Sequence, residues 1–176
     1  FFDPAHVKLT HVLESKKGEA PQSVRVFDID ARRRMDREIT DRTISFMRRC
    51  VADEKPFFAY VPYTLMHWPT LPHPDFAGST RNGEWADALA QMDAYTGELL
   101  DALDDLGIAE DTLFIFTSDN GPEMNRNWAG CSGPWRGTYF TALEGSLRVP
   151  FIARWPGRIP AGGISNEIVH IMDLYS

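Results

Sequence analysis

Residues 111–123 read DTLFIFTSDNGPE, and we expect the fold to be organised around this stretch. The run from Leu113 to Thr117 is apolar without alternation, which is typical of a strand covered on both faces, as in a parallel sheet. Ser118 begins a polar segment, and the Gly121-Pro122 pair that follows cannot continue the strand. The pattern therefore predicts a buried strand that ends at a polar turn.

An acid and an amide, Asp119 and Asn120, stand side by side where this strand ends. In open α/β sheets, ligands bind just beyond the carboxyl ends of the strands. Carboxylate and amide oxygens are hard ligands, which suit calcium or magnesium better than a soft metal. The two residues are therefore candidate metal ligands, although Asp-Asn-Gly is also a common turn sequence.

Other segments predict an α/β fold with alternating elements. Apolar residues recur at helical spacing over 35–51 and over 85–106, and Gly107 is a suitable helix stop. Short apolar runs at 57–61 and 150–154 are expected to be strands. The first of these strands, the second helix and the strand of the opening stretch would form a βαβ unit, which should be parallel and right-handed.

The two ends of the chain carry weaker patterns. Residues 1–34 are expected to be irregular, with one short strand near 24–29, and a helix is expected to begin within 168–175. Residues 62–84 and 121–148 read as long connections, and loops of that length in compact domains are often functional.

The composition is that of one globular domain: 176 residues, 43% of them hydrophobic, with a net charge of −7. The acidic balance argues against a general nucleic-acid binder. We interpret the arginine run from Arg32 to Arg37 as a solvated helix face. No apolar run approaches the length of a membrane span. Cys50 lies on an apolar helical stripe and is interpreted as a buried thiol, while pairing with Cys131 stays open.

Three polar positions follow predicted strands: His67, the pair Asp119 and Asn120, and the loop from Arg136 to Glu144. In a parallel sheet these loops open on the same edge, so the side chains could converge. A metal and a cation that hold negative charge, with a histidine that handles a proton, suit an anionic ester. Each position also has an ordinary interpretation: a loop-packing histidine, a turn, and a surface stacking pair of Trp135 with Arg136.

Four segments together resemble the type I sulfatases of the alkaline-phosphatase-like superfamily. They are PFFAYVPYTLMHWP, DTLFIFTSDNGPE, GPWRGTYFTALEGSLRVPFIARWPGRIPAG and SNEIVHIMD, and the resemblance runs from about residue 40 to the end. It implies an α/β three-layer sandwich around a mostly parallel sheet, incomplete at its N-terminal side. It also implies hydrolysis of a sulfate ester, either a small molecule or a sulfated glycan, by a periplasmic or secreted parent protein.

The resemblance assigns a role to each matched residue. Asp119 and Asn120 match the family's late pair of ligands to one calcium ion. His67 matches the histidine that contacts the sulfate ester and helps the leaving group depart. Glu144-Gly145 and Arg148 match a structural segment that leads into a core strand.

The chain departs from the family pattern in two places. Many members carry a sulfate-binding lysine five residues before the Glu-Gly pair; Tyr139 stands there, and Arg136 is our candidate for the missing cation. The family's nucleophile, a formylglycine made from cysteine in a C-x-P-S-R motif, has no counterpart around Cys50 or Cys131. We therefore expect residues 1–176 to be a partial catalytic domain that lacks the nucleophile-bearing part and is inactive by itself.

Two alternatives stay open. The Tyr139 departure leaves room for a phosphate or phosphonate ester hydrolase of the same superfamily. The missing nucleophile leaves room for a metal-stabilised binding module without catalysis. The coding sequence upstream of Phe1 would separate these possibilities.

Overall fold

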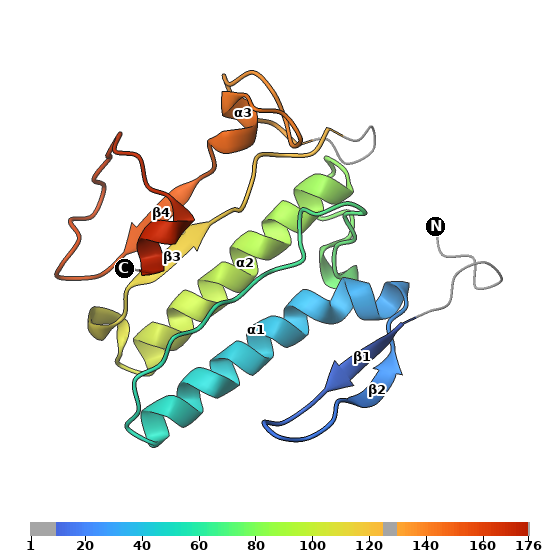
Figure 1. Cartoon of the computed structure of the whole chain (residues 1–176), viewed down its shortest axis with the longest axis vertical. Coiled ribbons are helices and arrows are strands. Elements are labelled where there is room, and N and C mark those ends of the chain that lie inside the picture. The colour runs from blue at the N-terminus through green and yellow to red at the C-terminus, as the bar shows by residue number, and fades with distance from the viewer. Residues whose placement is uncertain (1–9, 125–129, 176) are drawn as a thin grey trace.

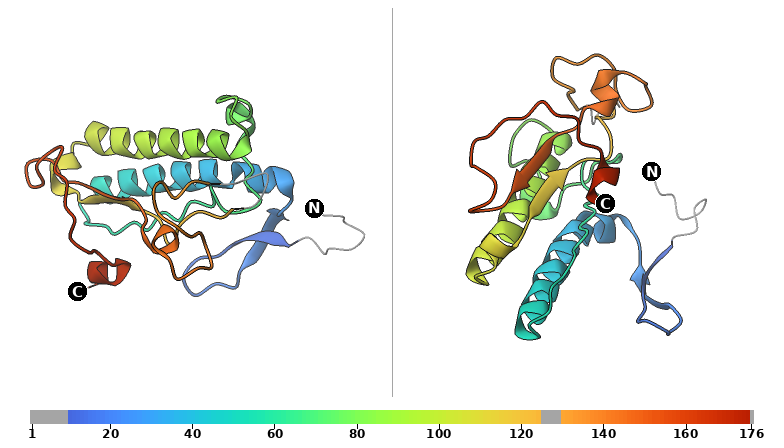
Figure 2. Two further views of the ribbon diagram at one scale, coloured as in Figure 1. Left: turned by 90° about the horizontal axis from the view of Figure 1, so that it is seen from above. Right: turned by 60° about the vertical axis from the view of Figure 1, so that its left-hand side comes forward.

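The computed structural model describes residues 10–124 and 130–175, which form two long helices and two small sheets. In chain order the elements are β1 (His11–Glu14), β2 (Gln22–Val26), α1 (Ile29–Ala52), η1 (Pro74–Phe76), α2 (Glu84–Asp105), η2 (Ala109–Asp111), β3 (Phe114–Thr117), α3 (Glu144–Leu147), β4 (Phe151–Arg154) and η3 (Ile171–Tyr175). Helices α1 and α2 lie side by side and run in the same direction (Figure 1). The connection between them runs back along the pair, and β3 and β4 lie on the same side of the helices as this connection (Figure 2).

Helix α1 begins at Ile29, earlier than the predicted start at residue 35. Asp28 caps it, because its side chain accepts a hydrogen bond from the Ala31 amide at 2.9 Å. Asp30 adds a negative charge in the first turn, where it interacts favourably with the positive end of the helix dipole. The apolar periodicity that located the helix begins only at Met35, because the first turns make polar contacts instead.

Helix α2 confirms the predicted helix over 85–106 to within one residue at each end. The predicted stop at Gly107 is also confirmed. Gly107 adopts a positive φ of 69°, and the Ile108 amide reaches back to the Leu103 carbonyl at 3.0 Å. This is the left-handed turn that commonly closes a helix, and glycine adopts it without steric cost.

The hydrophobic core lies between the later halves of the two helices. Met47, Leu99, Ala102 and Leu103 form its buried centre. Phe57, Val61 and Phe114 pack against that centre from the strand side. Only the two ends of the apolar run at 57–61 reach the core, whereas Phe58 is 77% and Tyr60 73% exposed, so the run is not buried as predicted. It runs in the same direction as β3 (Figure 1).

The predicted strand at 57–61 is nevertheless wrong for the described chain, because this segment pairs with no strand there. Strands β3 and β4 confirm the runs at 113–117 and 150–154, but they pair antiparallel, with Phe114 opposite Arg154 and Thr117 opposite Phe151. A run becomes a strand only beside a hydrogen-bonding neighbour, and 57–61 has none within the described residues. The chain thus follows the path of the predicted parallel βαβ unit, but the two segments expected to be its strands are not paired with each other in the described residues.

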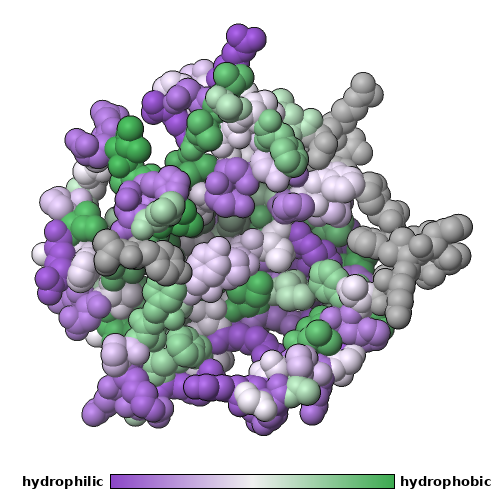
Figure 3. Space-filling model, viewed as in Figure 1, coloured by the Kyte–Doolittle hydropathy of each residue, from purple (hydrophilic) through white to green (hydrophobic). Residues whose placement is uncertain are grey.

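Both ends of the chain differ from expectation. Part of the supposedly irregular first segment is an antiparallel hairpin of β1 and β2, in place of one short strand near 24–29. The predicted C-terminal helix is a short 3₁₀ segment, η3. Among the described residues, no helix is both long and apolar enough to cross a membrane. Exposed apolar side chains interrupt the polar surface on the face seen in Figure 3, and Ile152 is 59% exposed.

Candidate active site

The loop that carries His67 is joined to the segment after β3 by one hydrogen bond. The backbone amide of Trp68 donates to the Glu123 carboxylate at 3.0 Å. Glu123 lies four residues beyond Asp119, so the bond brings the histidine loop beside the strand end. The loop of His67 and the segment after β3 are therefore joined at these two residues.

Three glycines bring the third position to the same place. The Gly121 amide donates to the Ser146 carbonyl at 2.8 Å, and the Gly145 amide donates to the Arg136 carbonyl at 2.9 Å. A Cβ at Gly121 would lie 1.9 Å from the Gly145 oxygen, and one at Gly145 would lie 2.3 Å from the Gly137 oxygen. Backbone contacts backbone directly at both points, which only glycine permits. We call Gly121, Gly137 and Gly145 the glycine stack.

Tyr139 is tied to the same segment, since its amide donates to the Pro122 carbonyl at 3.1 Å. The main chains next to Asn120, His67, Arg136 and Tyr139 are thus linked to one another by hydrogen bonds. The convergence expected from the sequence occurs at the level of the backbone.

Asp119 and Asn120 offer oxygens that the described residues leave largely uncommitted. Asp119 is exposed and accepts only a long 3.5 Å bond from the Ser118 hydroxyl. The Asn120 amide nitrogen donates to the Gly121 carbonyl at 2.9 Å, which turns the nitrogen toward the backbone and leaves the amide oxygen available. These two oxygens fit a hard cation. The described residues contain no group of three or more acidic, histidine or cysteine side chains that could complete a metal site.

The His67 ring is exposed, and its Nδ1 lies 2.6 Å from the Trp68 carbonyl oxygen. A carbonyl can only accept, so Nδ1 carries a proton in this arrangement. Nε2 of the neutral ring is then an acceptor, and Nε2 of the protonated ring is a donor. The backbone contact therefore fixes which nitrogen can exchange a proton with a substrate.

The two substrate-binding candidates differ in their surroundings. The Arg136 side chain is exposed, and none of the described residues pairs with it. The Tyr139 ring packs against Phe140, with ring centroids 4.1 Å apart. Trp135 does not stack on Arg136; its ring lies 4.3 Å from the guanidinium carbon of Arg148. Arg148 also pairs with Glu144, so it ties the loop together, as expected of a structural residue.

A buried polar network, which the sequence did not reveal, holds the start of the histidine loop. Asp36 is 1% exposed; its two carboxylate oxygens accept from the Thr64 amide at 2.5 Å and from the Thr64 hydroxyl at 2.6 Å. Arg32 donates to the Thr64 hydroxyl at 2.6 Å and to the Thr64 carbonyl at 2.7 Å. Burial raises the pKa of Asp36 and lowers the pKa of Arg32, because both charged forms lose water.

The interpretation of the arginine run as a solvated face is therefore wrong for Arg32, Arg33 and Arg37, whereas Arg34 is exposed. Arg32 contacts Thr64, Arg33 donates to the Pro72 carbonyl at 3.2 Å, and Arg37 pairs with Glu98 of α2 at 2.7 Å. These side chains face the loop and the second helix because polar backbone, and not apolar surface, covers this side of α1. The spacing of Arg32, Asp36 and Thr40 on one helix face was the available signal.

Helix α2 holds the rest of the loop. Gln91 accepts from the His73 amide at 2.7 Å, and Asp87 accepts from the amides of Gly78 and Thr80 at 2.8 and 2.9 Å. A hydrogen bond from the Thr80 hydroxyl, followed by the two from these amides, lowers the pKa of Asp87. The long connection over 62–84 is thus ordered by side chains from both helices.

Comparison with known proteins shows the family of the chain. A family model described as Sulfatase matches residues 6–176. The chain belongs to the sulfatase family. It is 40% identical to human arylsulfatase A over 138 residues, which is 76% of this chain and 27% of that protein. It is 39% identical to dog N-acetylgalactosamine-6-sulfatase over 135 residues, again 76% of this chain and 26% of that protein. The chain therefore spans about a quarter of the length of these curated relatives.

Solved sulfatase structures share the fold of this chain. The PsFucS1 sulfatase from Pseudoalteromonas sp. superposes with a TM-score of 0.77 at 33% identity, covering 85% of this chain and 30% of that one. A Bacteroides thetaiotaomicron sulfatase superposes with a TM-score of 0.66 at 36% identity, covering 72% of this chain and 28% of that one. The fold is thus that of the sulfatases, which are alkaline-phosphatase-like.

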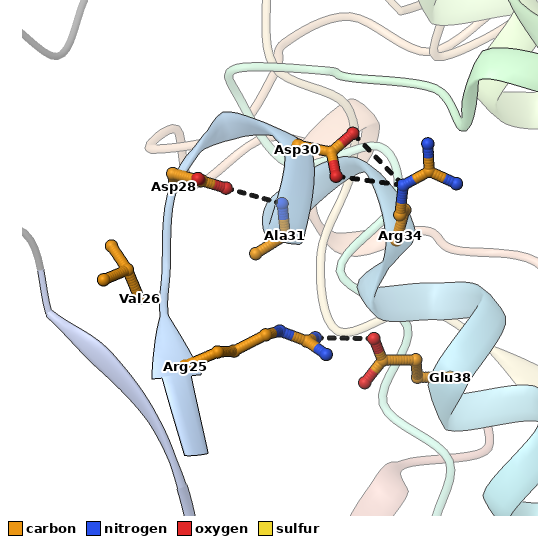
Figure 4. A pocket seen from close by; sticks show the side chains of 7 residues that line it. All are labelled: Arg25, Val26, Asp28, Asp30, Ala31, Arg34 and Glu38. Atoms are coloured by element: carbon orange, nitrogen blue, oxygen red, sulfur yellow. Dashed lines mark hydrogen bonds and ion pairs between the residues drawn. The ribbon is translucent and has the colours of Figure 1, made fainter. Parts of the chain in front are cut away.

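One hollow in this sulfatase chain lies away from the site, between β2 and the start of α1 (Figure 4). Its volume is about 280 Å³. Its charged groups are already paired: Arg25 with Glu38 at 2.5 Å and Arg34 with Asp30 at 3.0 Å. Asp28 is committed to the helix cap. The hollow therefore offers no uncompensated charge to a ligand.

Proposed function

We propose that the complete protein hydrolyses sulfate esters, and that residues 1–176 supply the later part of its catalytic domain. One observation carries the proposal: the bond from the Trp68 amide to Glu123 and the backbone contacts of the glycine stack link the loops of His67, of Asp119 and Asn120, and of Arg136. Membership of the sulfatase family supports the same chemistry. Sulfated sugars are the proposed substrate class, by analogy with the relatives named for N-acetylgalactosamine 6-sulfate.

In this proposal Asp119 and Asn120 supply two of the oxygen ligands of one calcium ion. Calcium bound there would draw charge away from the sulfate oxygens. Further ligands must come from elsewhere in the protein, because calcium takes six to eight oxygens. The nucleophile, expected to be a formylglycine, must also come from elsewhere: Cys50 is followed by Val-Ala-Asp and Cys131 by Ser-Gly-Pro.

His67 would act on the leaving group. With Nδ1–H held by the Trp68 carbonyl, a protonated His67 presents Nε2–H outward as the donor. Proton transfer to the departing oxygen matters most when that oxygen is a poor leaving group, such as a sugar alkoxide. Arg136, and Tyr139 in the place of the usual lysine, are the proposed contacts to the sulfate.

We also propose that the sheet is completed in the whole protein. The segment 57–61 and β3 run in the same direction over the same helix pair, and the former has no strand neighbour in the described part of the chain (Figure 1). Strands from the rest of the domain would turn both into members of a mostly parallel sheet. A second helical layer on its other face would give the three-layer sandwich.

The test uses the complete protein, purified with its upstream sequence. We expect calcium-dependent turnover of p-nitrophenyl sulfate and of a sulfated sugar. His67→Ala should reduce turnover of the sulfated sugar far more than that of the activated aryl sulfate. The matched control is His11→Ala, an exposed histidine on β1, which should have no effect.

The outcomes discriminate between the alternatives. Preference for p-nitrophenyl phosphate over the sulfate would favour the phosphate ester hydrolase. Tyr139, in the position of the usual sulfate-binding lysine, is the feature that leaves this alternative open. Calcium binding without turnover of either ester would favour a binding module. An equal loss on both sulfates in His67→Ala would assign His67 to sulfate binding alone. The isolated 176-residue chain should be inactive under all conditions.

A further inference from the structure

Thr64 is held by α1 at all of its polar groups. Its amide and hydroxyl donate to Asp36, and its hydroxyl and carbonyl oxygens accept from Arg32. The four distances lie between 2.5 and 2.7 Å, and Asp36 is fully buried. So complete a set of contacts fixes the main chain of Thr64 in both position and orientation, because each bond constrains a different direction.

The backbone between Thr64 and His67 needs such an anchor. Met66 has a φ of 73°, in the left-handed region that residues with a side chain rarely adopt. A conformation of this kind persists only when the surrounding structure holds it. Thr64 lies two residues before Met66, and His67 lies directly after it.

The other end of the loop is anchored by the same helix. Arg33 donates to the Pro72 carbonyl at 3.2 Å, and a guanidinium nitrogen of Arg34 lies 3.4 Å from Nε2 of His73. The first turns of α1 thus contact the loop on both sides of His67. His67 itself is exposed, and its recorded hydrogen bond goes to the backbone of its own neighbour, Trp68. Among residues 10–124 and 130–175, no side chain outside the loop bonds to the ring, so the position of the main chain sets the position of the ring.

We infer that Arg32 and Asp36 are positioning residues that set the placement of His67 through Thr64. The inference rests on the proposed function, since it assumes that His67 acts on the leaving group. It assigns to the first turns of α1 a role in the reaction rate, in addition to their role in the fold.

The test is a double-mutant cycle in the complete protein. Thr64→Val removes the hydroxyl and keeps the shape, whereas Thr64→Ser keeps the hydroxyl. We expect Thr64→Val to lower kcat for a sulfated sugar by about tenfold or more with little change in KM, and to affect p-nitrophenyl sulfate much less. Thr64→Ser should stay close to the wild type. Thr43→Val is the matched control, because Thr43 bonds only within α1, to the Ile39 carbonyl at 2.8 Å.

Introducing Thr64→Val into the His67→Ala variant tests whether Thr64 acts through the histidine. There, Thr64→Val should cause no further loss of kcat, since the group it positions is gone. A loss that multiplies with that of His67→Ala, or equal rates for Thr64→Val and Thr64→Ser, would overturn the inference. If His67→Ala alone has no effect, the proposed function fails and not merely this step. Should Thr64→Val fail to fold, Arg32→Lys replaces it, because lysine keeps the charge but lacks the planar fork whose two nitrogens contact the Thr64 hydroxyl and carbonyl.

Discussion

The backbone amide of Trp68 and the carboxylate of Glu123, 55 residues apart in the chain, are joined by a 3.0 Å hydrogen bond. This bond ties the loop of His67 to the segment of Asp119. It is a side-chain contact, so it can be removed without touching either of the two proposed functional residues.

Replacing Glu123 should loosen the site. Glu123→Ala deprives the Trp68 amide of this acceptor, and we expect a loss of about 1–2 kcal/mol in the free energy of unfolding. Turnover of the complete protein should fall by about tenfold or more, because His67 and Asp119 are no longer held together. Glu123→Gln keeps an oxygen acceptor and should retain most activity. Steady-state kinetics and thermal melting of both variants check this, and equal activity of the two would contradict it.

The glycine stack should tolerate no side chain. Gly121→Ala would place a Cβ 1.9 Å from the Gly145 oxygen, so the two backbone segments must separate. We expect a destabilisation of about 3 kcal/mol or more. Gly97→Ala is the matched control: Gly97 lies inside α2 with open space around it, and alanine should stabilise the helix by about 0.5–1 kcal/mol. Opposite shifts in melting temperature are the expected result, and similar shifts would refute the steric argument.

Asp119 should determine the calcium requirement of the complete protein. Asp119→Asn keeps an oxygen but removes the charge, and we expect the calcium concentration for half-maximal activity to rise about tenfold or more. Asp119→Ala should abolish calcium-dependent activity without unfolding, because the side chain is exposed. Asp105→Asn, an exposed acid at the end of α2, should change nothing. An unchanged calcium titration in Asp119→Asn would remove this residue from the metal site.

Asp36 should make stability depend on pH. Burial, which outweighs the hydrogen bonds from Thr64 and the charge of Arg32, raises its pKa above the value of 3.8. The folded state therefore holds the Asp36 proton more tightly than the unfolded state does. The resulting stabilisation is complete below pH 3.8 and is lost as the pH rises through the raised pKa.

Asp36→Asn cannot ionise and lacks this dependence. The melting temperature of the wild type, measured relative to Asp36→Asn, should thus fall as the pH rises from about 3.5 to about 7. Thermal melting of both proteins in matched buffers measures the difference. A difference that moves in the opposite direction would mean that Arg32 and Thr64 outweigh burial.

The spacing of apolar residues in the sequence predicts the elements that pack against the hydrophobic core. Helix α2 follows from the helical spacing of its apolar residues, and strand β3 from a continuous apolar run. Gly107 follows from the backbone geometry that ends a helix. The start of α1 was missed because Arg32 and Asp36 face Thr64 and not an apolar core. The run at 57–61 was assigned as a strand although strand pairing depends on a neighbour that sequence periodicity does not report.

The candidate site, like the fold, could be predicted only in part from the sequence. Asp119, Asn120 and His67 were recognisable because short motifs carry them next to predicted strand ends. The bond from Trp68 to Glu123 and the network around Asp36 link residues 55 and 28 positions apart, and no local pattern marks such pairs. Sequence reasoning therefore supplied the candidate reactive groups, whereas the structure supplied the contacts that hold them in place.

The glycine stack bears on how this protein can change over evolutionary time. Where Gly121 meets Gly145, and Gly145 meets Gly137, the separation of the segments is set by the radii of main-chain atoms. Every residue type carries those atoms, so exchanges among the surrounding side chains leave the spacing unaltered. The side chains at positions 136 and 139, the proposed contacts to the sulfate, can then be exchanged while the distance from their backbone to that of Asn120 stays constant. Selection for a different ester would thus change side chains while the separation of the backbone segments that carry them stays the same.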